Sequence, residues 1–282
     1  MFDSIAGDYD SLNHILSLDV DKIWRKKALK QIVDAPAPAR VLDLACGTGD
    51  FSIAIAKALS RSHKRVGTPI EAHVKAPAKA PVEASVKAPV EAPAKAPVEA
   101  QVTSTGFVTG DSGRSDLMTK GHVTGVDLSE GMLAVMREKV QKAGLTEMIS
   151  IEEGDGENLR FPDNTFDRVT IAFGIRNFEN RPIGLREMLR VLKPGGRLVI
   201  LELSRPENKI IRWFYDLYFL HILPKIGGKV SGDKAAYAYL PASVAAFPGK
   251  KAFMATMREA GFRAVTHKAF TLGICRMYTG EK

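Results

Sequence analysis

Cysteine is scarce in this sequence. Only two of its 282 residues are cysteines, Cys46 and Cys275, and two thiols cannot build the disulfide framework of a small secreted domain. No group of cysteines and histidines has the spacing of metal ligands, so we expect no metal site. These absences favour a protein of a reducing compartment such as the cytoplasm.

A long apolar run is also lacking. The most apolar stretch, residues 210–223, is interrupted by Arg212, Asp216 and His221 and is shorter than the ~18–20 residues of a membrane span. Residues 1–4 have neither the basic start nor the apolar stretch of a secretory signal. We therefore expect a cytoplasmic protein that makes at most transient contact with a membrane, at its inner face.

Positive charge is in excess, with a net charge of +8. Such a balance favours acidic partners such as anionic lipid headgroups or nucleic acid, although it also simply promotes solubility. Long clusters of lysine and arginine with interleaved aromatic residues are missing. We therefore expect no nucleic-acid partner.

Residues 41–50, Val-Leu-Asp-Leu-Ala-Cys-Gly-Thr-Gly-Asp, are the most informative part of the chain. An apolar run that contains Asp43 ends at a small-residue turn, residues 47–49, and a helical pattern of apolar residues begins at Phe51. Strand, glycine turn and helix in this order form a ligand site at the carboxyl end of a parallel strand. An ordinary tight turn is the alternative.

The acids around this turn indicate the charge of the ligand. A dinucleotide-binding turn has three glycines, and Ser52 stands where the third would be. Asp43 and Asp50 would repel a pyrophosphate but attract a cation. The common cationic nucleoside cofactor is S-adenosylmethionine, a sulfonium with an amino-acid end, and we expect it here.

A repetitive segment interrupts the chain after this motif. Residues 79–102 repeat with a period of eight, each unit beginning Lys-Ala-Pro-Val-Glu-Ala. Frequent proline excludes helix and sheet interiors, and the small side chains bury too little apolar area to offset chain entropy. We predict a disordered insertion over residues 61–118, within a single discontinuous domain formed by residues 1–60 and 119–282.

The insertion explains the position of a second acid. Asp127 ends another apolar run and follows Asp43 by 84 residues; without the 58 residues of the insertion, 26 remain. A ribose-binding acid at the end of the second strand follows the first motif by about 20 residues. Asp127 is therefore predicted to bind the ribose hydroxyls. It could also cap the helix expected over residues 129–142, and both roles can hold.

The rest of the chain continues to alternate between strands and helices. We expect strands at 149–153, 166–173 and 197–203, helices at 180–192 and up to residue 260, and last strands near 262–270 and 273–279. This alternation predicts an α/β fold, with a doubly wound, mostly parallel sheet of seven strands and helices on both faces.

With these segments in place, the sequence resembles the S-adenosylmethionine-dependent C-methyltransferases of ubiquinone and menaquinone biosynthesis. The resemblance covers nearly everything outside the insertion and implies the Rossmann-like fold of class I methyltransferases. The Phe-Gly-Ile-Arg-Asn run and the opening segment are the most specific parts. The matching segments are 2–10, 42–50, 161–167, 172–177, 190–196 and 237–241.

The resemblance also implies which residues contact the cofactor. Contacts carry over to Thr48, Asp127, Asp155 and Gly156, where the last two follow the third strand and meet the adenine. The glycine turn adds Asp43, Gly47 and Gly49. Two positions depart from the family pattern: Gly156 is often alanine, and Ala172 replaces a common serine.

The implied reaction is methylation of a ring carbon of demethylmenaquinol to give menaquinol. The equivalent step on a prenylated methoxy-benzoquinol is an alternative, as is a methyltransferase for another small molecule or for RNA. Arg176 and Asn177 follow the fourth strand, where acceptors usually meet the cofactor in this fold, and are the predicted catalytic residues. Arg176 could instead form a structural ion pair.

Two further segments are candidates for substrate contact. Residues 210–224 are densely aromatic, with Trp213 and Phe214 among them, and could form core packing or a lid over an isoprenoid tail. Near them, His221 is either packed or a proton acceptor, and Lys225, Lys229 and Lys234 could face anionic headgroups. Tyr9 and Asp10 could close over the cofactor.

Overall fold

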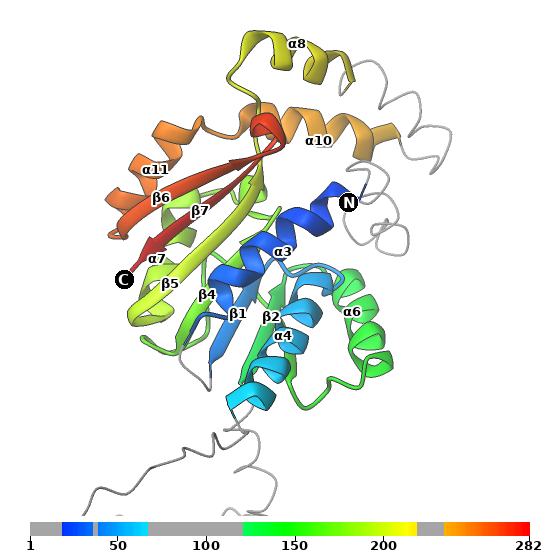
Figure 1. The fold of residues 1–282 in the computed structure, drawn as a ribbon, viewed down its shortest axis with the longest axis vertical. Helices are drawn as coiled ribbons and strands as arrows, with labels where there is room; N and C mark the ends of the chain where they lie inside the picture. Colours follow the sequence, from blue (N-terminus) through cyan, green and yellow to red (C-terminus); the bar gives the residue numbers. More distant parts are fainter. Residues whose placement is uncertain (1–18, 36–38, 67–120, 219–233) are drawn as a thin grey trace, which may run out of the picture.

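The computed structural model describes residues 19–35, 39–66, 121–218 and 234–282, and within these it describes no side chains for 62–66 and 234–238. In this part of the chain seven strands form one sheet in the order β3-β2-β1-β4-β5-β7-β6 (Figure 1). The strands are β1 Arg40–Leu44, β2 His122–Asp127, β3 Ile149–Glu153, β4 Phe166–Ala172, β5 Leu192–Leu203, β6 Arg263–Phe270 and β7 Cys275–Glu281.

The direction of the strands confirms the mostly parallel sheet. Neighbouring strands from β3 to β5 pair in parallel, whereas β7 pairs antiparallel with both β5 and β6. The chain adds β2 and β3 on one side of β1 and then returns to add β4 on the other side. At such a reversal the loops that follow two neighbouring strands diverge, which leaves a crevice at their carboxyl ends.

Helices cover both faces of this sheet (Figure 1). One core joins α3, α4 and α6 to the sheet, and the other joins α7 and α11 to the opposite face. The helices are α3 Val20–Ile32, α4 Asp50–Val66, α6 Glu130–Lys142, α7 Arg181–Val191, α8 Lys209–Leu217, α10 Lys234–Ala246 and α11 Lys250–Glu259, with 3₁₀ turns η1 Ile175–Asn177 and η3 Thr271–Gly273.

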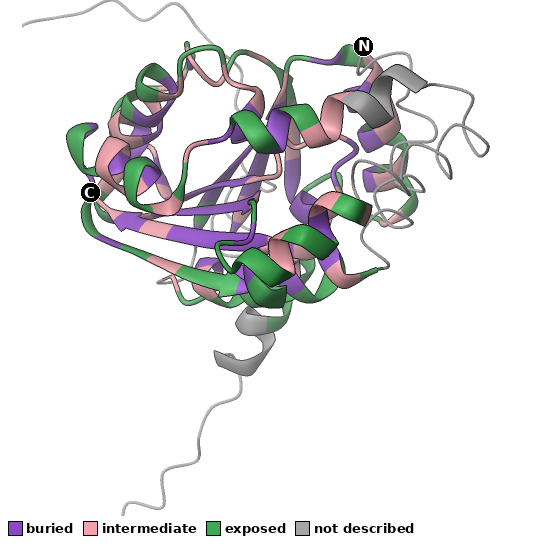
Figure 2. Ribbon diagram, turned by 90° about the horizontal axis from the view of Figure 1, so that it is seen from above, coloured by how far each residue is buried: buried purple, intermediate pink, exposed green. Residues whose placement is uncertain are grey.

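Alternating side chains along the strands supply both cores. In β5, Leu198 and Ile200 pack with α7 and α11, while Val199 and Leu201 pack with the helices of the other face. All four are fully buried, and Figure 2 shows the buried residues along the strands with exposed residues on the outer sides of the helices. The strands are apolar on both faces because each face is covered, as is typical of parallel sheets.

The expected segments overlap the observed strands and helices, although several ends differ and α3 and α10 have no expected counterpart. The fifth strand begins at Leu192 rather than at residue 197, so it includes the turn residues 193–196. Helix α4 continues to Val66, so the first six residues of the predicted insertion are helical. Residues 67–120, which contain the rest of the insertion, lie outside the described residues, and the division of the chain at 61–118 stays a prediction.

The strand that follows the insertion pairs with the strand that precedes the glycine turn. His122 at the start of β2 pairs with Arg40 at the start of β1, and its N–H donates to the carbonyl oxygen of Ala39 at 2.9 Å. The segments before and after the insertion therefore form adjacent strands of one sheet. Of the helices in the described ranges, none is long and apolar enough to cross a membrane.

Candidate functional site

The glycine turn lies at the carboxyl end of β1, beside the crevice. The backbone reverses through positive φ angles at Ala45 (48°), Gly47 (56°) and Gly49 (83°). A Cβ atom on Gly49 would lie 2.4 Å from Cγ of Met136 on α6, so this position requires glycine for both its backbone angle and its close packing. The turn is thereby pressed against α6.

The carboxylate of Asp127 connects this turn to the next strand. Its Oδ2 accepts a hydrogen bond from the N–H of Gly47 at 2.8 Å, and its Oδ1 accepts one from the N–H of Ser129 at 2.9 Å. The hydroxyl of Ser129 in turn caps α6 by accepting from the N–H of Met132 at 3.2 Å. Asp127 therefore holds the turn and the start of α6 together, while Ser129 is the helix cap.

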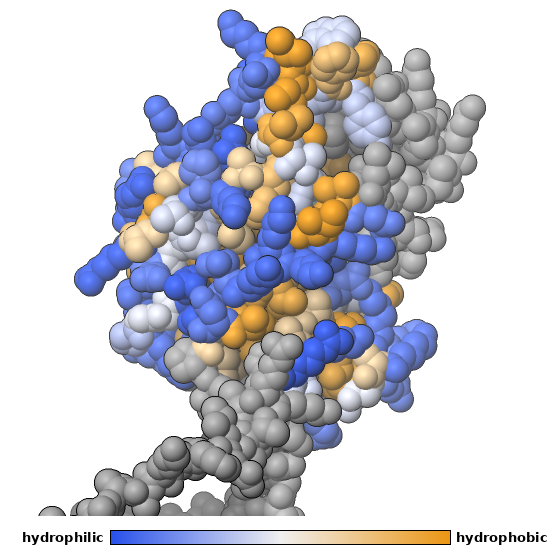
Figure 3. Space-filling model, in the orientation of Figure 1, coloured by the Kyte–Doolittle hydropathy of each residue, from blue (hydrophilic) through white to orange (hydrophobic). Residues whose placement is uncertain are grey.

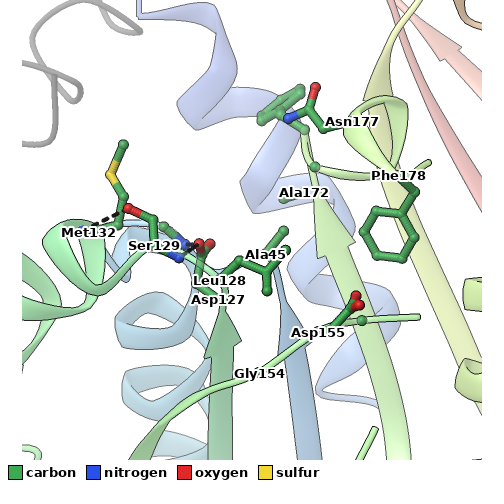
Figure 4. Close-up of a pocket in the computed structure, with 14 residues that line it drawn as sticks. Ala45, Asp127, Leu128, Ser129, Met132, Gly154, Asp155, Ala172, Asn177 and Phe178 are labelled. Carbon is green, nitrogen blue, oxygen red and sulfur yellow. Dashed lines mark hydrogen bonds between the residues drawn. The ribbon is translucent and has the colours of Figure 1, made fainter. Parts of the chain in front are cut away.

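A cavity of about 270 Å³ opens at the carboxyl ends of β1, β2 and β4 and beside the loop after β3. Figure 4 shows Asp127 and Asp155 near strand ends on its floor, with Asn177 and Phe178 contributed by the segment after β4. The lining thus combines carboxylates with aromatic rings. It is lined by Ala45, Gly47, Asp127, Leu128, Ser129, Met132, Gly154, Asp155, Gly156, Ala172, Phe173, Gly174, Asn177 and Phe178.

A second, smaller cavity of about 40 Å³ adjoins the first. The two share four lining residues, which are Ala45, Gly47, Ala172 and Phe173. The small cavity is otherwise lined by Arg25, Asp43, Cys46, Thr48, Asp50 and Phe51.

The structure brings most of the predicted cofactor residues together. Gly47, Asp127, Asp155 and Gly156 line the large cavity, and Asp43 and Thr48 line the small one. Gly49 lines neither cavity; its positive φ angle and its close approach to Met136 determine the path of the turn.

Asp43 is a buried acid in the middle of an apolar strand. Its side chain is 1% exposed, and its Oδ2 accepts a hydrogen bond from the hydroxyl of Ser52 at 2.6 Å. Burial raises the pKa of this carboxyl from 3.8 to about 7; the hydrogen bond from Ser52 and the charge of Arg25 oppose the rise, and the charge of Asp127 adds to it. A cation in the small cavity would favour the ionised form of Asp43.

The loop after β3 explains why glycine stands at position 156. A Cβ atom there would lie 2.5 Å from Cζ of Phe178, so the aromatic ring occupies the space that an alanine would need. Asp155 is exposed, and its Oδ1 accepts a hydrogen bond from the N–H of Glu157 at 2.8 Å. The ring and the carboxylate together form one end of the large cavity.

Arg176 is held by a buried ion pair. Its Nη1 donates to Oε1 of Glu202 at 2.8 Å and also to the carbonyl oxygen of Phe173, and its Nε donates to the hydroxyl of Ser243 at 3.3 Å. Arg176 is 8% exposed, Glu202 is fully buried, and Arg176 lines neither cavity. These contacts are those of a structural ion pair, the alternative given above for Arg176. Contact of Arg176 with the methyl acceptor stays a prediction.

Asn177 does line the large cavity, and a residue of α10 fixes its side chain. The hydroxyl of Tyr239 donates to Oδ1 of Asn177 at 2.8 Å. The amide nitrogen is therefore the end of this side chain that remains for another acceptor.

Sequence reasoning did not find three residues of this region, Arg25, Glu202 and Tyr239. The signal for Glu202 was present, because it is a lone acid in an apolar strand, as Asp43 is. Tyr239 lies in one of the segments that matched the family, but its partner lies 62 residues away in sequence.

The described part of the aromatic segment is only partly packed in the core. On α8, Ile210, Trp213 and Phe214 are at least 60% exposed, whereas Tyr215 is buried. Several predicted residues lie outside the described part of the chain, so their roles stay predictions. These are Tyr9, Asp10 and the rest of 2–10, His221, Lys225, Lys229, and the side chains of Lys234 and Tyr237.

Comparisons with known proteins give a consistent result. The family model of the ubiE/COQ5 methyltransferase family matches residues 1–282. The ubiquinone/menaquinone biosynthesis C-methyltransferase UbiE of Geobacter sulfurreducens is 41% identical over 282 residues, which are 100% of this chain and 87% of the relative. Demethylmenaquinone methyltransferases of Bacteroides fragilis and Deinococcus radiodurans are 36% and 39% identical, each over 100% of this chain and 91% of the relative.

Solved structures with the same fold are more distant in sequence. A SAM-dependent methyltransferase from Aquifex aeolicus has a TM-score of 0.51 at 18% identity, covering 91% of this chain and 88% of its own. A putative S-adenosyl-L-methionine-dependent methyltransferase from Methanococcus maripaludis has a TM-score of 0.56 at 15% identity, covering 100% and 94%. These two likenesses support the fold.

We predict that Asp43 makes stability depend on pH in the protein without ligand. Between 3.8 and about 7 the unfolded chain loses a proton that the folded protein keeps on this carboxyl. The free energy of unfolding should therefore fall as the pH rises, by about 3 kcal/mol between pH 5 and pH 8. Urea denaturation of the wild type and of Asp43→Asn at both pH values measures this contribution, which the variant should lack. An equal fall in both proteins would contradict the prediction.

Proposed function

The chain belongs to the ubiE/COQ5 methyltransferase family, and from this premise we propose that it methylates demethylmenaquinol to menaquinol with S-adenosylmethionine as the methyl donor. The observation that carries the proposal is full-length similarity, at 36–39% identity, to relatives named for this step. The name of the Geobacter relative includes ubiquinone, so the benzoquinol reaction is the second candidate.

The chemistry of the cavity residues fits the cofactor. The nucleoside offers hydroxyl and amino groups as donors, and Asp127 and Asp155 offer carboxylate oxygens as acceptors in the large cavity. The two oxygens of Asp127 accept the backbone N–H groups of Gly47 and Ser129, which orients the carboxylate at the cavity. The positive charge of the sulfonium and of the amino-acid end suits Asp43 in the adjoining small cavity.

The apolar side of the cavity suits the methyl transfer. When bound, S-adenosylmethionine would supply an electrophilic methyl group. A ring carbon of the deprotonated quinol would take this methyl group as its bond to sulfur breaks, which leaves S-adenosylhomocysteine, and the proton lost from the carbon would return to the quinol oxygen. Charge is neutralised between the reactants, so removal of water favours the step. Met132, Phe173 and Phe178 line the cavity with apolar surface and would exclude water once a quinol ring is seated.

We assign Asn177 as the residue that contacts the quinol. Because Tyr239 donates to its Oδ1, the amide nitrogen is the group that can donate to a quinol oxygen. A donor placed at an oxygen that gains negative charge lowers the barrier to transfer.

Arg176, the other predicted catalytic residue, would act by positioning the backbone of its neighbours. Its neighbours Asn177 and Phe173 line the large cavity. The contacts of Arg176 with Glu202 and with the carbonyl oxygen of Phe173 fix the backbone between them. Glu202 also accepts from the backbone N–H of Arg176 at 3.1 Å, so the turn η1 is held at two points.

Contact with a membrane surface would give access to a prenylated substrate. Ile210, Trp213 and Phe214 form an exposed apolar face on α8, with exposed Lys209 beside them. Figure 3 shows apolar side chains gathered at the end of the molecule where α8 lies. An apolar face with a tryptophan and a basic residue is suited to the interface of an anionic bilayer. We propose that α8 makes the transient contact.

The function is tested with the purified chain, labelled S-adenosylmethionine, and reduced demethylmenaquinone and the benzoquinone precursor in separate reactions. We expect the label in a methylated naphthoquinol, identified by mass. Faster turnover of the benzoquinol would favour the second candidate. Binding of the cofactor with no methylated product from either quinol would overturn both.

We predict that Asn177 and Tyr239 affect turnover rather than cofactor binding. Asn177→Ala should lower kcat by about 100-fold, since a donor to the developing charge is lost. Tyr239→Phe should lower kcat by about tenfold, since it only releases the amide. Cofactor affinity, measured by calorimetry, should change less than about twofold. Ala245→Ser, at an exposed position of α10, is the control. A parallel loss of affinity would show that Asn177 belongs to the cofactor site.

A third prediction concerns the exposed face of α8. The double variant Trp213→Ala/Phe214→Ala should sediment much less with vesicles of anionic lipid, because each aromatic ring contributes ~1–3 kcal/mol of burial. Its turnover of a quinol with a short, water-soluble tail should be unchanged. Ile183→Ala, which removes an exposed apolar side chain from α7, is the control and should sediment as the wild type does. Unchanged sedimentation of the double variant would exclude α8 as the contact.

A further inference from the structure

Arg25 on α3 lies at the small cavity and has no part in the transfer described so far. Its guanidinium carbon lies 5.6 Å from the centre of the Phe173 ring, and Phe173 lines both cavities. The side chain of Arg25 is 18% exposed. A largely buried arginine beside a ligand cavity needs anionic partners, because burial of an unpaired charge is costly.

The two acids near Arg25 make only long contacts with its guanidinium. Its Nη1 lies 3.5 Å from Oδ2 of Asp50, and its Nη2 lies 3.6 Å from Oδ2 of Asp21. Both distances exceed the ~2.7–2.9 Å of a charge-assisted hydrogen bond. Asp50 is also bound by Lys139 through its other oxygen. Two long contacts therefore leave the guanidinium able to bind another anion.

The Nε atom of Arg25 gives a second, independent sign. It is buried, and it has no hydrogen-bond partner in the described protein. An arginine side chain presents Nε and one Nη side by side, in the geometry that matches the two oxygens of a carboxylate. A buried donor without a partner destabilises the protein, and a carboxylate ligand would supply the missing acceptor.

The position of the small cavity indicates which carboxylate this is. The cavity shares Ala45, Gly47, Ala172 and Phe173 with the large cavity, which has the carboxylates suited to a nucleoside. A ligand that extends from the large cavity past these residues reaches Asp43 and Arg25. One of these is an acid and the other a base, so together they complement a group that carries an ammonium and a carboxylate.

We propose that Arg25 binds the carboxylate of the amino-acid end of S-adenosylmethionine, and that the chain thereby selects nucleosides that carry a free carboxylate. This assignment rests on the proposed function, because it takes S-adenosylmethionine as the cofactor. Asp43 receives the ammonium group of the same amino-acid end. The pairing also explains why a buried acid and a largely buried base line one small cavity, each with few partners of its own.

The test compares ligands that differ only at the amino-acid end, by calorimetry with the full chain. S-adenosylhomocysteine carries both charged groups, its decarboxylated analogue keeps the ammonium alone, and 5′-methylthioadenosine has neither. Arg25→Gln should weaken S-adenosylhomocysteine binding by about 10- to 100-fold, as expected for loss of a charge-assisted hydrogen bond. Binding of the other two ligands should change by less than about threefold. Arg25→Lys should restore part of the affinity for S-adenosylhomocysteine.

A matched control separates this contact from a general effect of charge. Lys26→Gln removes one positive charge from an exposed neighbouring position of the same helix and should leave all three affinities unchanged. The melting temperature of each variant without ligand checks that the fold is intact.

Two outcomes would overturn the assignment. Equal loss of affinity for all three ligands from Arg25→Gln would show that Arg25 supports the cavity wall through Phe173. Unchanged affinities would show that Arg25 pairs with Asp21 and Asp50 and does not bind the ligand. If the wild type binds neither S-adenosylmethionine nor S-adenosylhomocysteine, the proposed function fails as well, which distinguishes the two failures.

Discussion

The carboxylate of Asp127 joins two segments that are 80 residues apart in sequence, and the geometry of the site depends on this junction. One oxygen accepts from the N–H of Gly47 in the turn after β1, and the other accepts from the N–H of Ser129, the cap residue of α6. The turn, the second strand and α6 are thus fixed relative to one another before any ligand binds. The groups that a ligand would contact at this turn therefore need no rearrangement, which lowers the free-energy cost of binding.

Two acids inside apolar strands have different roles at the site. Asp43 in β1 and Glu202 in β5 are both buried, but their partners differ. Glu202 is neutralised by the guanidinium of Arg176, so its position is structural and η1 is held in place. Among the described residues the side chain of Asp43 accepts a hydrogen bond only from the hydroxyl of Ser52, and burial raises its pKa to about 7. The less compensated of the two acids is the one that lines a cavity.

Local patterns were sufficient to predict the strands, the turn and the place of Asp127, because apolar periodicity, glycines and acids at strand ends lie within short windows of sequence. The nature of the side-chain contacts was not predictable in this way. Tyr239 meets Asn177 across 62 residues and Arg176 meets Glu202 across 26, and only packing of α10 and β5 around η1 brings them together. Arg25 lies in a helix without a recognisable motif, and its relevance follows from the cavity alone.

Helix α4 starts at the glycine turn and runs back along the sheet, so it ends at Val66 on the side where β1 and β2 begin. Val66 and His122 therefore both lie at the end of the sheet where these parallel strands begin, opposite the cavity at their carboxyl ends (Figure 1). A reporter or a tether built into the chain between Val66 and His122 would therefore enter the molecule on the side away from the cavity.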